Sequence, residues 1–361
     1  MRRSGYADSR DPGVTRARLA AALGALAFGA GCAATWTLRN AVPAAPLQWP
    51  FAPAAARVVY EGAVNGLEPG TDASSVLRWI VFGSDSEELN SFVLPVDVAV
   101  ASDGRMAVAD TGRRCVHLYR PADKAYQQLT GEGENRLISP VGVAFDGAQR
   151  LYVADSAGRI DVFGADGAFV TAFTMAGTRP FVRPTGLAFS TKTGLLYVVD
   201  TLASEVVALR PSGELAFSFG SRGEEPGSFN FPTRIAWSPR GELYVADSLN
   251  FRIQIFDEAG KPLGAFGHHG DGSGDLAMPK GIAVDDAGVV YVVDGILDNV
   301  QLFSRSGEFL LTLGERGVAD GQFWLPSGAF VGSGGRLYVC DSYNRRVQVF
   351  RIAARDASDA S

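Results

Sequence analysis

The chain has 361 residues, of which 47% are hydrophobic, 10% aromatic and 20% charged, a composition typical of a globular protein. Three cysteines and three histidines are too few for a disulfide-rich scaffold or for a four-cysteine or histidine-rich metal site. A formal net charge of −6 at pH 7 argues against a nucleic-acid-binding surface, so no nucleic acid partner is expected.

Residues 1–40 are predicted to be a targeting segment. They hold six arginines and two aspartates, and a run of twenty uncharged, mostly small residues lies between Arg18 and Arg39. Such a run is long enough to cross a bilayer as a helix, and the flanking arginines would keep the N-terminus inside. The sequence FGAGC (28–32) resembles a bacterial lipobox, which makes Cys32 a lipidation candidate. A lipoprotein signal, an uncleaved signal anchor and a cleaved signal peptide all remain open.

Without this segment the chain carries a charge of −10, because residues 1–40 contribute +4 to the total of −6. Residues 41–76 follow as a Pro- and Ala-rich linker, expected to be an extended spacer beside the membrane. Within this linker, residues 57–64 (RVVYEGAV) form a candidate accessory strand. The rest of the protein is therefore predicted to lie outside the cytoplasm, in the periplasm or at the cell surface.

A repeat of about 47 residues organises the remainder of the chain. Six segments end in YVAD or a close variant, and their aspartates lie 45 to 47 residues apart. These repeat aspartates are Asp110, Asp155, Asp200, Asp247, Asp294 and Asp341. A proline opens each unit, with starts near residues 95, 140, 184, 232, 279 and 326. Each unit contains four short β-type runs separated by turn residues, which predicts an all-β, six-bladed propeller of four-stranded antiparallel blades.

The ends of the chain predict how the ring closes. The sixth unit ends in RVQVFRI and lacks the outer strand of the other five, while residues 351–361 are expected to be a flexible tail. Residues 77–83 (LRWIVFG) match the outer strands in pattern and in their spacing to the next proline. They are therefore predicted to complete the sixth blade as an N-terminal closing strand, which removes a free sheet edge.

With the motifs PxG[IL]A[VF], Gx[IL]YVADS and NxR[VI]QVF, the chain resembles the NHL-repeat family of six-bladed β-propellers. The resemblance covers residues 77–350, and the whole chain is similar to bacterial membrane-attached or lipoprotein members. It implies the fold and says much less about function, because propellers include enzymes, sensors and scaffolds. The repeat aspartates are interpreted as structural, since a residue needed once per blade normally accepts hydrogen bonds in a turn.

Departures from the repeat are the candidate binding residues. Asp97 and Arg234 replace the PxG glycine in two blades, and Lys280 follows the proline of blade five. In this family's topology, these three should ring one pore mouth together with Thr185, Thr233 and Ser327. The turns between second and third strands should lie on the same face. Their candidate contact residues, rich in arginine and aromatic side chains, are Arg113, Arg114, Asn250, Phe251, Tyr343 and Arg345.

Metal and catalytic chemistry find little support in the sequence. Peptide-amidating lyase relatives hold zinc with histidines around the pore, and gluconolactonase-like propellers hold a divalent ion with Glu, Asn and Asp side chains. Here the predicted pore mouth has no histidine and one acid, Asp97. His268, His269 and His117 are not expected to bind metal, and Cys115 and Cys340 are expected to be buried thiols. No catalytic residue, metal site or cofactor is therefore predicted.

The expected function is non-catalytic binding. In this interpretation, a propeller held at the outer side of a bacterial membrane recognises an envelope protein or a small ligand through its pore-mouth loops. The alternative is a divalent-metal-dependent hydrolase or lactonase of the gluconolactonase type, which is the one reading that requires a cation. A third possibility is a structural component of an envelope complex.

Overall fold

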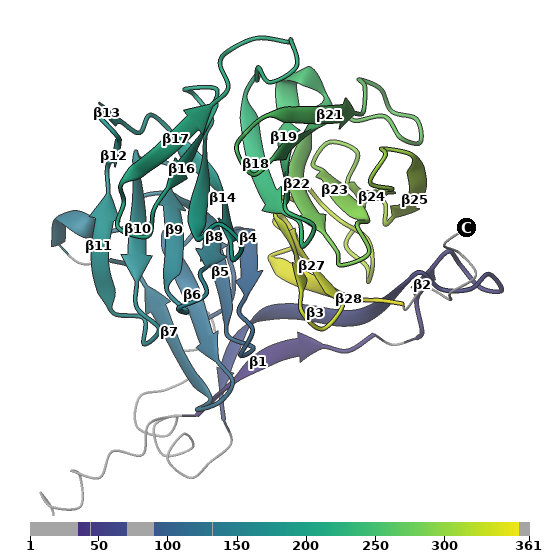
Figure 1. Cartoon of the computed structure of the whole chain (residues 1–361). Helices are drawn as coiled ribbons and strands as arrows, with labels where there is room; N and C mark the ends of the chain where they lie inside the picture. Colours follow the sequence, from purple (N-terminus) through teal and green to yellow (C-terminus); the bar gives the residue numbers. More distant parts are fainter. Residues whose placement is uncertain (1–34, 44, 71–89, 132, 354–361) are drawn as a thin grey trace, which may run out of the picture.

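The structure is a computed structural model that describes residues 35–43, 45–70, 90–131 and 133–353. Six antiparallel sheets are arranged around a central axis, with one inner strand of each sheet beside that axis (Figure 1). The all-β, six-bladed propeller expected from the repeat is confirmed. Among the described residues, no helix is both long and apolar enough to span a bilayer.

Blades one to five each use four consecutive strands. In blades one and two these are β4 (Pro95–Val100), β5 (Met106–Asp110), β6 (Cys115–Arg120), β7 (Ala125–Leu129), β8 (Pro140–Phe145), β9 (Leu151–Asp155), β10 (Arg159–Phe163) and β11 (Phe169–Phe173). In blade three they are β14 (Pro184–Ser190), β15 (Leu195–Asp200), β16 (Glu205–Leu209) and β17 (Leu215–Phe219). In blades four and five they are β18 (Pro232–Trp237), β19 (Glu242–Asp247), β20 (Arg252–Asp257), β21 (Pro262–Phe266), β22 (Pro279–Val284), β23 (Val290–Asp294), β24 (Asn299–Phe303) and β25 (Phe309–Leu313).

Short elements join these blades. A two-stranded hairpin and two single-turn 3₁₀ helices lie in the connections: β12 (Met175–Ala176), β13 (Arg179–Pro180), η1 (Gly133–Asn135) and η2 (Ser248–Asn250).

Blade six is completed by the N-terminal part of the chain. Its first three strands are β26 (Ala329–Gly332), β27 (Arg336–Asp341) and β28 (Arg346–Ile352), and its fourth is β3 (Val58–Pro69), which pairs antiparallel with β28. An N-terminal strand therefore closes the ring, as expected. The strand is the one predicted as accessory at 57–64, here longer; residues 77–83, predicted to close the blade, lie outside the described residues. The place beside β28 is taken by β3.

The segment expected to be a spacer is instead packed on this blade. Strands β1 (Trp36–Ala41) and β2 (Gln48–Trp49) both pair with β3, so the described chain is already in a sheet from Trp36. Trp49 is 6% exposed and contacts Phe350 edge to face, with ring centroids 5.9 Å apart. The Pro- and Ala-rich composition hid this anchor because a single buried tryptophan leaves no periodic pattern.

The core lies between adjacent blades. The second-strand tyrosines Tyr152, Tyr197, Tyr244 and Tyr291 are almost fully buried, as are the third-strand phenylalanines Phe256, Phe303 and Phe350. Each blade is sandwiched by its neighbours, so both faces of its middle strands are covered and the sequence there is almost continuously apolar. This sandwiching explains why one repeat cannot fold alone and why the ring must close.

Strand register separates the two faces of the disc. In blades one to five the inner strand begins opposite a repeat aspartate, as in the pairs Pro95–Asp110 and Pro279–Asp294. The turns between second and third strands therefore lie at the end of the disc where the inner strands begin. We call this end the loop face; its turns are residues 111–114, 156–158, 201–204, 248–251, 295–298 and 342–345. The other end is the opposite face.

Candidate functional site

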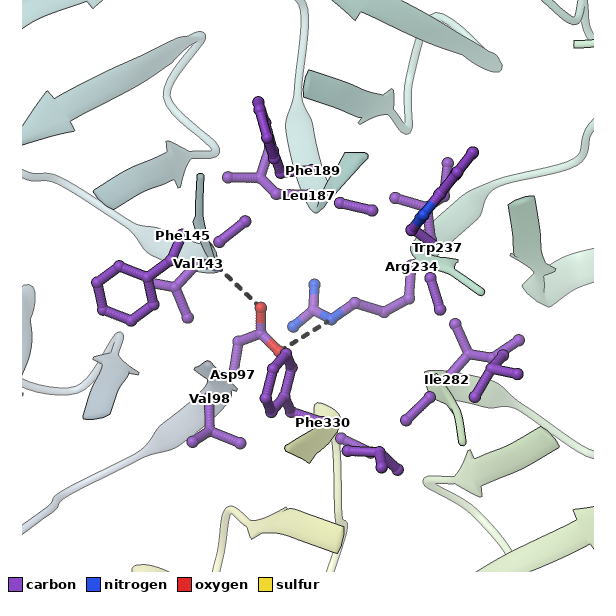
Figure 2. Close-up of a pocket in the computed structure, with 18 residues that line it drawn as sticks. Asp97, Val98, Val143, Phe145, Leu187, Phe189, Arg234, Trp237, Ile282 and Phe330 are labelled. Atoms are coloured by element: carbon purple, nitrogen blue, oxygen red, sulfur yellow. Dashed lines mark hydrogen bonds and ion pairs between the residues drawn. The ribbon is translucent and has the colours of Figure 1, made fainter. Parts of the chain in front are cut away.

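The pore is crossed by a charged pair. Arg234 on β18 of blade four reaches across the axis to Asp97 on β4 of blade one, with 3.8 Å between Arg234 Nε and Asp97 Oδ1 (Figure 2). Arg234 Nη2 also donates to the backbone carbonyls of Val96 (2.9 Å) and Val141 (2.8 Å). Side chains from opposite blades thus meet at the axis. The repeat pattern of the sequence does not predict this contact.

Asp97 is buried, and the side chain of Arg234 is 11% exposed. Asp97 is 6% exposed, and its Oδ2 accepts a hydrogen bond from the Val143 amide at 2.9 Å. Burial raises the pKa of Asp97, while the Arg234 guanidinium and the amides of Val143 and Val98 oppose that shift. The expected open ring of polar residues is therefore replaced, for these two residues, by an internal contact that ties three blades together.

Apolar side chains form the walls of the pore beyond this pair. A cavity of about 160 Å³ lies there, lined by inner-strand residues that include Phe145, Phe189, Trp237 and Phe330 (Figure 2). Asp97 and Arg234 are the charged residues among those lining it. At the equivalent positions other blades use glycine: a Cβ on Gly142 would lie 2.0 Å from the Thr185 carbonyl oxygen. Inner strands crowd the axis at this level, which leaves little room.

A divalent cation of the gluconolactonase kind does not fit these residues. Such an ion needs several oxygen ligands that converge on one point. The axial acid, Asp97, already accepts the Val143 amide and faces the guanidinium of Arg234, a fixed cation standing where the ion would have to bind. Among the described residues, no three His, Cys, Asp or Glu side chains are grouped so that they could hold a metal ion.

Small hydroxyl side chains of the expected ring connect neighbouring blades. Thr185 Oγ1 donates to the carbonyl of Thr233 (3.0 Å), and Ser327 Oγ donates to that of Val96 (2.9 Å). Thr233 Oγ1 lies 2.7 Å from Ser248 Oγ. These polar groups are satisfied within the fold, so their presence at the mouth has a structural explanation.

Lys280 is the member of the ring that differs. It is half-buried, and among the described residues it makes no ion pair or hydrogen bond that satisfies its amine. Burial lowers the pKa of Lys280, the nearby Arg234 lowers it further, and Asp294 opposes both. A cation with an unsatisfied amine thus lies beside a second cation at the pore mouth.

Each repeat aspartate organises the connection that leads into its own blade. Asp110 accepts the amides of Val93 and Leu94, and Asp155 accepts those of Ile138 and Ser139. All six carboxylates are fully buried: Asp110, Asp155, Asp200, Asp247, Asp294 and Asp341. Buried carboxylates are stable when backbone donors surround them, and these bonds hold the turn before each proline in place.

The second-to-third-strand turns divide the predicted contact residues into two groups. Arg113 donates through Nε to the Ser91 carbonyl at 2.6 Å, and Asn250 donates to the Gly223 carbonyl at 2.9 Å. Phe251 packs on His269 with ring centroids 4.3 Å apart. These three side chains are half-buried and support the loops, whereas Arg114, Tyr343 and Arg345 are exposed.

The loop face carries a row of exposed apolar or aromatic residues, of which sequence reasoning identified only Tyr343. Two residues after the repeat aspartate, four consecutive blades carry a large exposed apolar or aromatic side chain, here called the turn tips: Leu202 (53% exposed), Leu249 (46%), Ile296 (56%) and Tyr343 (53%). Trp324 packs beside Tyr343 with centroids 5.7 Å apart and is itself 40% exposed. The equivalent residues of blades one and two are Gly112 and Ala157. Alignment of the six turns in the sequence would have been enough to find this recurring position.

Among the described residues, no cysteine or histidine lines the pore cavity. Cys115 and Cys340 are free and buried, and burial raises the pKa of both thiols, that of Cys115 to about 12. His117 lies in the core of blade one, where Nδ1 is 2.8 Å from Tyr126 Oη and Nε2 is 3.4 Å from Asp110 Oδ2. His268 pairs with Asp275 in the exposed connection between blades four and five.

Comparison with known proteins agrees with this geometry. The fold defines a six-bladed β-propeller, and the NHL repeat model matches residues 229–256 and 323–350, which are blades four and six. The chain is thus a six-bladed β-propeller with NHL repeats in blades four and six. No curated protein matches its sequence.

Solved structures with the same architecture have diverse activities. A gluconolactonase from Xanthomonas campestris is 19% identical, with 73% of this chain and 87% of that chain covered and a TM-score of 0.55. Virginiamycin B lyase from Staphylococcus aureus is 13% identical, with 73% and 86% covered and a TM-score of 0.52. An auxiliary nutrient binding protein from Bacteroides ovatus is 15% identical, with 73% and 70% covered and a TM-score of 0.56. At these identities the likeness concerns the fold alone.

Proposed function

We propose that this protein is a non-catalytic binding propeller that recognises an envelope protein through its loop face. The observation that carries the proposal is the row of turn tips in four consecutive blades. Large apolar side chains that are exposed in consecutive blades on one face do not stabilise a ring whose core lies between the blades. Aromatic and arginine residues, here Tyr343, Trp324, Arg114 and Arg345, are the types enriched where proteins bind one another.

The charge of this face supports the same proposal. Asp97 and Asp298, two acids near the axis and the turns, are buried and paired with Arg234 and with the Leu325 amide and Arg316. Exposed arginines therefore stand among the turn tips without an accessible acid beside them in the same turns, in a protein that carries −10 over residues 41–361. The connections between blades on this face also carry exposed acids, such as Glu224 and Glu225, so it is the arginines of the turns, Arg114 and Arg345, that suit acidic groups on a partner.

Tethering is the second part of the proposal. The basic and apolar composition of residues 1–40, with Cys32 as lipidation candidate, supports attachment at the outer side of a bacterial membrane. Metabolic labelling with an alkyne fatty acid tests it directly: we expect label on the full chain and none on Cys32→Ser. Label on neither, with the protein still in the membrane fraction, would favour a signal anchor.

Site-specific photo-crosslinking tests the recognition face. A photoreactive residue at Ile296 should give a discrete crosslinked product in intact cells, and one at Ala287, in a turn of the opposite face, should not. The same product in a chain that also carries Tyr343→Ser should decrease, because a neighbouring turn tip is lost. Equal products from both faces, or none from Ile296, would overturn the proposed face.

Hydrolase or lactonase activity is the alternative that the fold allows and the pore residues do not favour. The proposed binding function requires no cofactor. Metal analysis of the purified protein, followed by a lactone and ester screen, separates the two: about one tightly held divalent ion per chain with turnover would replace our proposal by the enzymatic one.

A further inference from the structure

Blade five departs from the other blades in two residues that belong together. Lys280 takes a position held by Val96, Val141, Thr185, Thr233 and Ser327 in the other blades. Gly295 follows the repeat aspartate, where the other blades have serine or threonine. A Cβ added to Gly295 would lie 2.7 Å from Cδ and 3.1 Å from Cε of Lys280. The missing side chain at Gly295 is what makes room for the lysine stem.

That room costs the ring a hydrogen bond. In four blades the serine or threonine after the repeat aspartate donates to the carbonyl of the proline that opens the next blade. These bonds are Thr111 to Pro140 (2.7 Å), Thr201 to Pro232 (2.7 Å), Ser248 to Pro279 (2.5 Å) and Ser342 to Pro95 (2.8 Å). Gly295 has no hydroxyl to offer the equivalent Pro326 carbonyl. A residue pair that gives up a repeated bond to hold a lysine is not explained by the needs of the fold.

The described surroundings of Lys280 leave its amine without a direct partner. Asp294, the acid that stabilises the charged amine, already accepts the amides of Ala277, Met278, Ile296 and Leu297. Arg234, the neighbouring cation, faces Asp97, so the Lys280 amine is the cationic group here that lacks a direct hydrogen-bonding or ion-pair partner among the described residues. A half-buried ammonium in this position gains most from an anionic ligand that replaces its lost hydration.

We propose that Lys280, seated over Gly295, binds one anionic group, a carboxylate or a phosphate, at the loop-face mouth of the pore. Arg234 contributes positive charge at a distance, because its Nη2 already donates to two backbone carbonyls and its Nε faces Asp97. The inference rests on the proposed function in one respect: the anionic group belongs to whatever the loop face recognises.

Titration of the full chain with inorganic phosphate and, separately, with glutarate tests the site by calorimetry at low salt. We expect saturable binding of at least one of these anions. Lys280→Met keeps the stem and removes the charge, so it should weaken that binding at least tenfold, whereas Lys280→Arg should stay within a few-fold. The matched control is Lys261→Met, an exposed lysine in a turn of the opposite face, which should bind like the unaltered protein. Unchanged affinity in Lys280→Met, or no saturable binding of either anion, would overturn the proposal.

A second variant predicts opposite effects on binding and stability. Gly295→Ser places a hydroxyl within reach of the Pro326 carbonyl and fills the space of the lysine stem, so anion binding should be lost while the melting temperature is kept or raised. Retained anion binding in a folded Gly295→Ser protein would refute the proposal that the space at Gly295 positions Lys280 for the anion. Because the probes are small anions, the result is independent of the partner: anion binding without a loop-face crosslink refutes the proposed function, and a crosslink without anion binding refutes this inference.

Discussion

Blades four and six differ from blade one in how the same carboxylate is used. Asp247 accepts hydrogen bonds from Asn250, Arg252 and Gln254, and Asp341 does so from the equivalent Asn344, Arg346 and Gln348. In blade one Asp110 instead faces His117, with Cys115 and Tyr126 against the same ring. Blades four and six are also the two that the NHL repeat model matches.

The comparison teaches where to look for function in a repeat protein. A side-chain set that recurs in equivalent positions serves the blade itself, as the two Asp, Asn, Arg and Gln sets do. A residue that departs from the repeated set needs a separate explanation. His117 is explained by local packing, and Asp97 and Arg234 by their contact across the axis. In our proposal, Lys280 is explained by a ligand. The following predictions separate these causes.

Closure should give the largest effect. Deletion of residues 57–69 removes β3, leaves β28 as a free edge and uncovers Phe350, so we expect loss of the cooperative thermal transition. Tyr60→Ala is the milder form: Tyr60 is 3% exposed and contacts Phe350, and its loss should cost about 3–5 kcal/mol. Thermal unfolding followed by circular dichroism measures both. A deletion mutant with an unchanged transition would contradict closure by β3.

The axial pair should come next. Arg234→Met leaves Asp97 as a buried charge without its partner, and we expect a loss of about 3–5 kcal/mol in the free energy of unfolding. The double variant Asp97→Gly with Arg234→Gly restores the residue that other blades have at these positions and should recover most of that loss. Urea denaturation provides the measurement. If the double variant is no more stable than Arg234→Met, the pair does more than balance charge.

The histidine of blade one should make stability depend on pH. Burial lowers the pKa of His117, with Asp110 opposing that shift and Arg113 adding to it, whereas in the unfolded chain it titrates near 6.5. The unfolded chain therefore binds the proton more readily, and stability should fall as pH drops below about 6.5, by at most about 1.4 kcal/mol per pH unit. His117→Gln, which installs the residue of blades four to six, should flatten this slope. Equal slopes in both proteins would show that another group titrates.

The turn tips should affect stability least. Tyr343→Ser removes an exposed side chain on the loop face, so the free energy of unfolding should change by less than about 0.5 kcal/mol. Capture of the partner in the crosslinking experiment should nevertheless weaken. A large loss of stability would instead assign Tyr343 to the packing of Trp324 and remove it from the recognition face.

The fold was largely predictable because its signals repeat. Period, proline starts and the YVAD strand are each local patterns that occur six times, so errors in one copy are corrected by the others. The closing strand occurs once. Residues 77–83 and 58–69 both have the β-type composition of an outer strand, and spacing to the next proline favoured the first; pairing with β28 belongs to the second.

The candidate site was less predictable for a related reason. Asp97, Arg234 and Lys280 all depart from the repeat, but their environments differ: the first two face each other across the axis, and the amine of the third has no direct partner among the described residues. Arg113, Asn250 and Phe251 have the composition of contact residues and prove to support the loops. Whether a polar or aromatic side chain faces inward depends on donors and acceptors from other turns, which a strand pattern does not contain.

The sequence by itself determined the number of blades, the order of their strands and the buried role of the repeat aspartates, because these depend on contacts within one repeat or between identical neighbours. Tertiary structure decided which N-terminal strand closes the ring, that Trp49 packs on blade six, and that residues 137 positions apart in the chain meet at the axis as Asp97 and Arg234. Contacts between blades and across the pore join segments far apart in the chain, and their partners are set by the geometry of the closed ring.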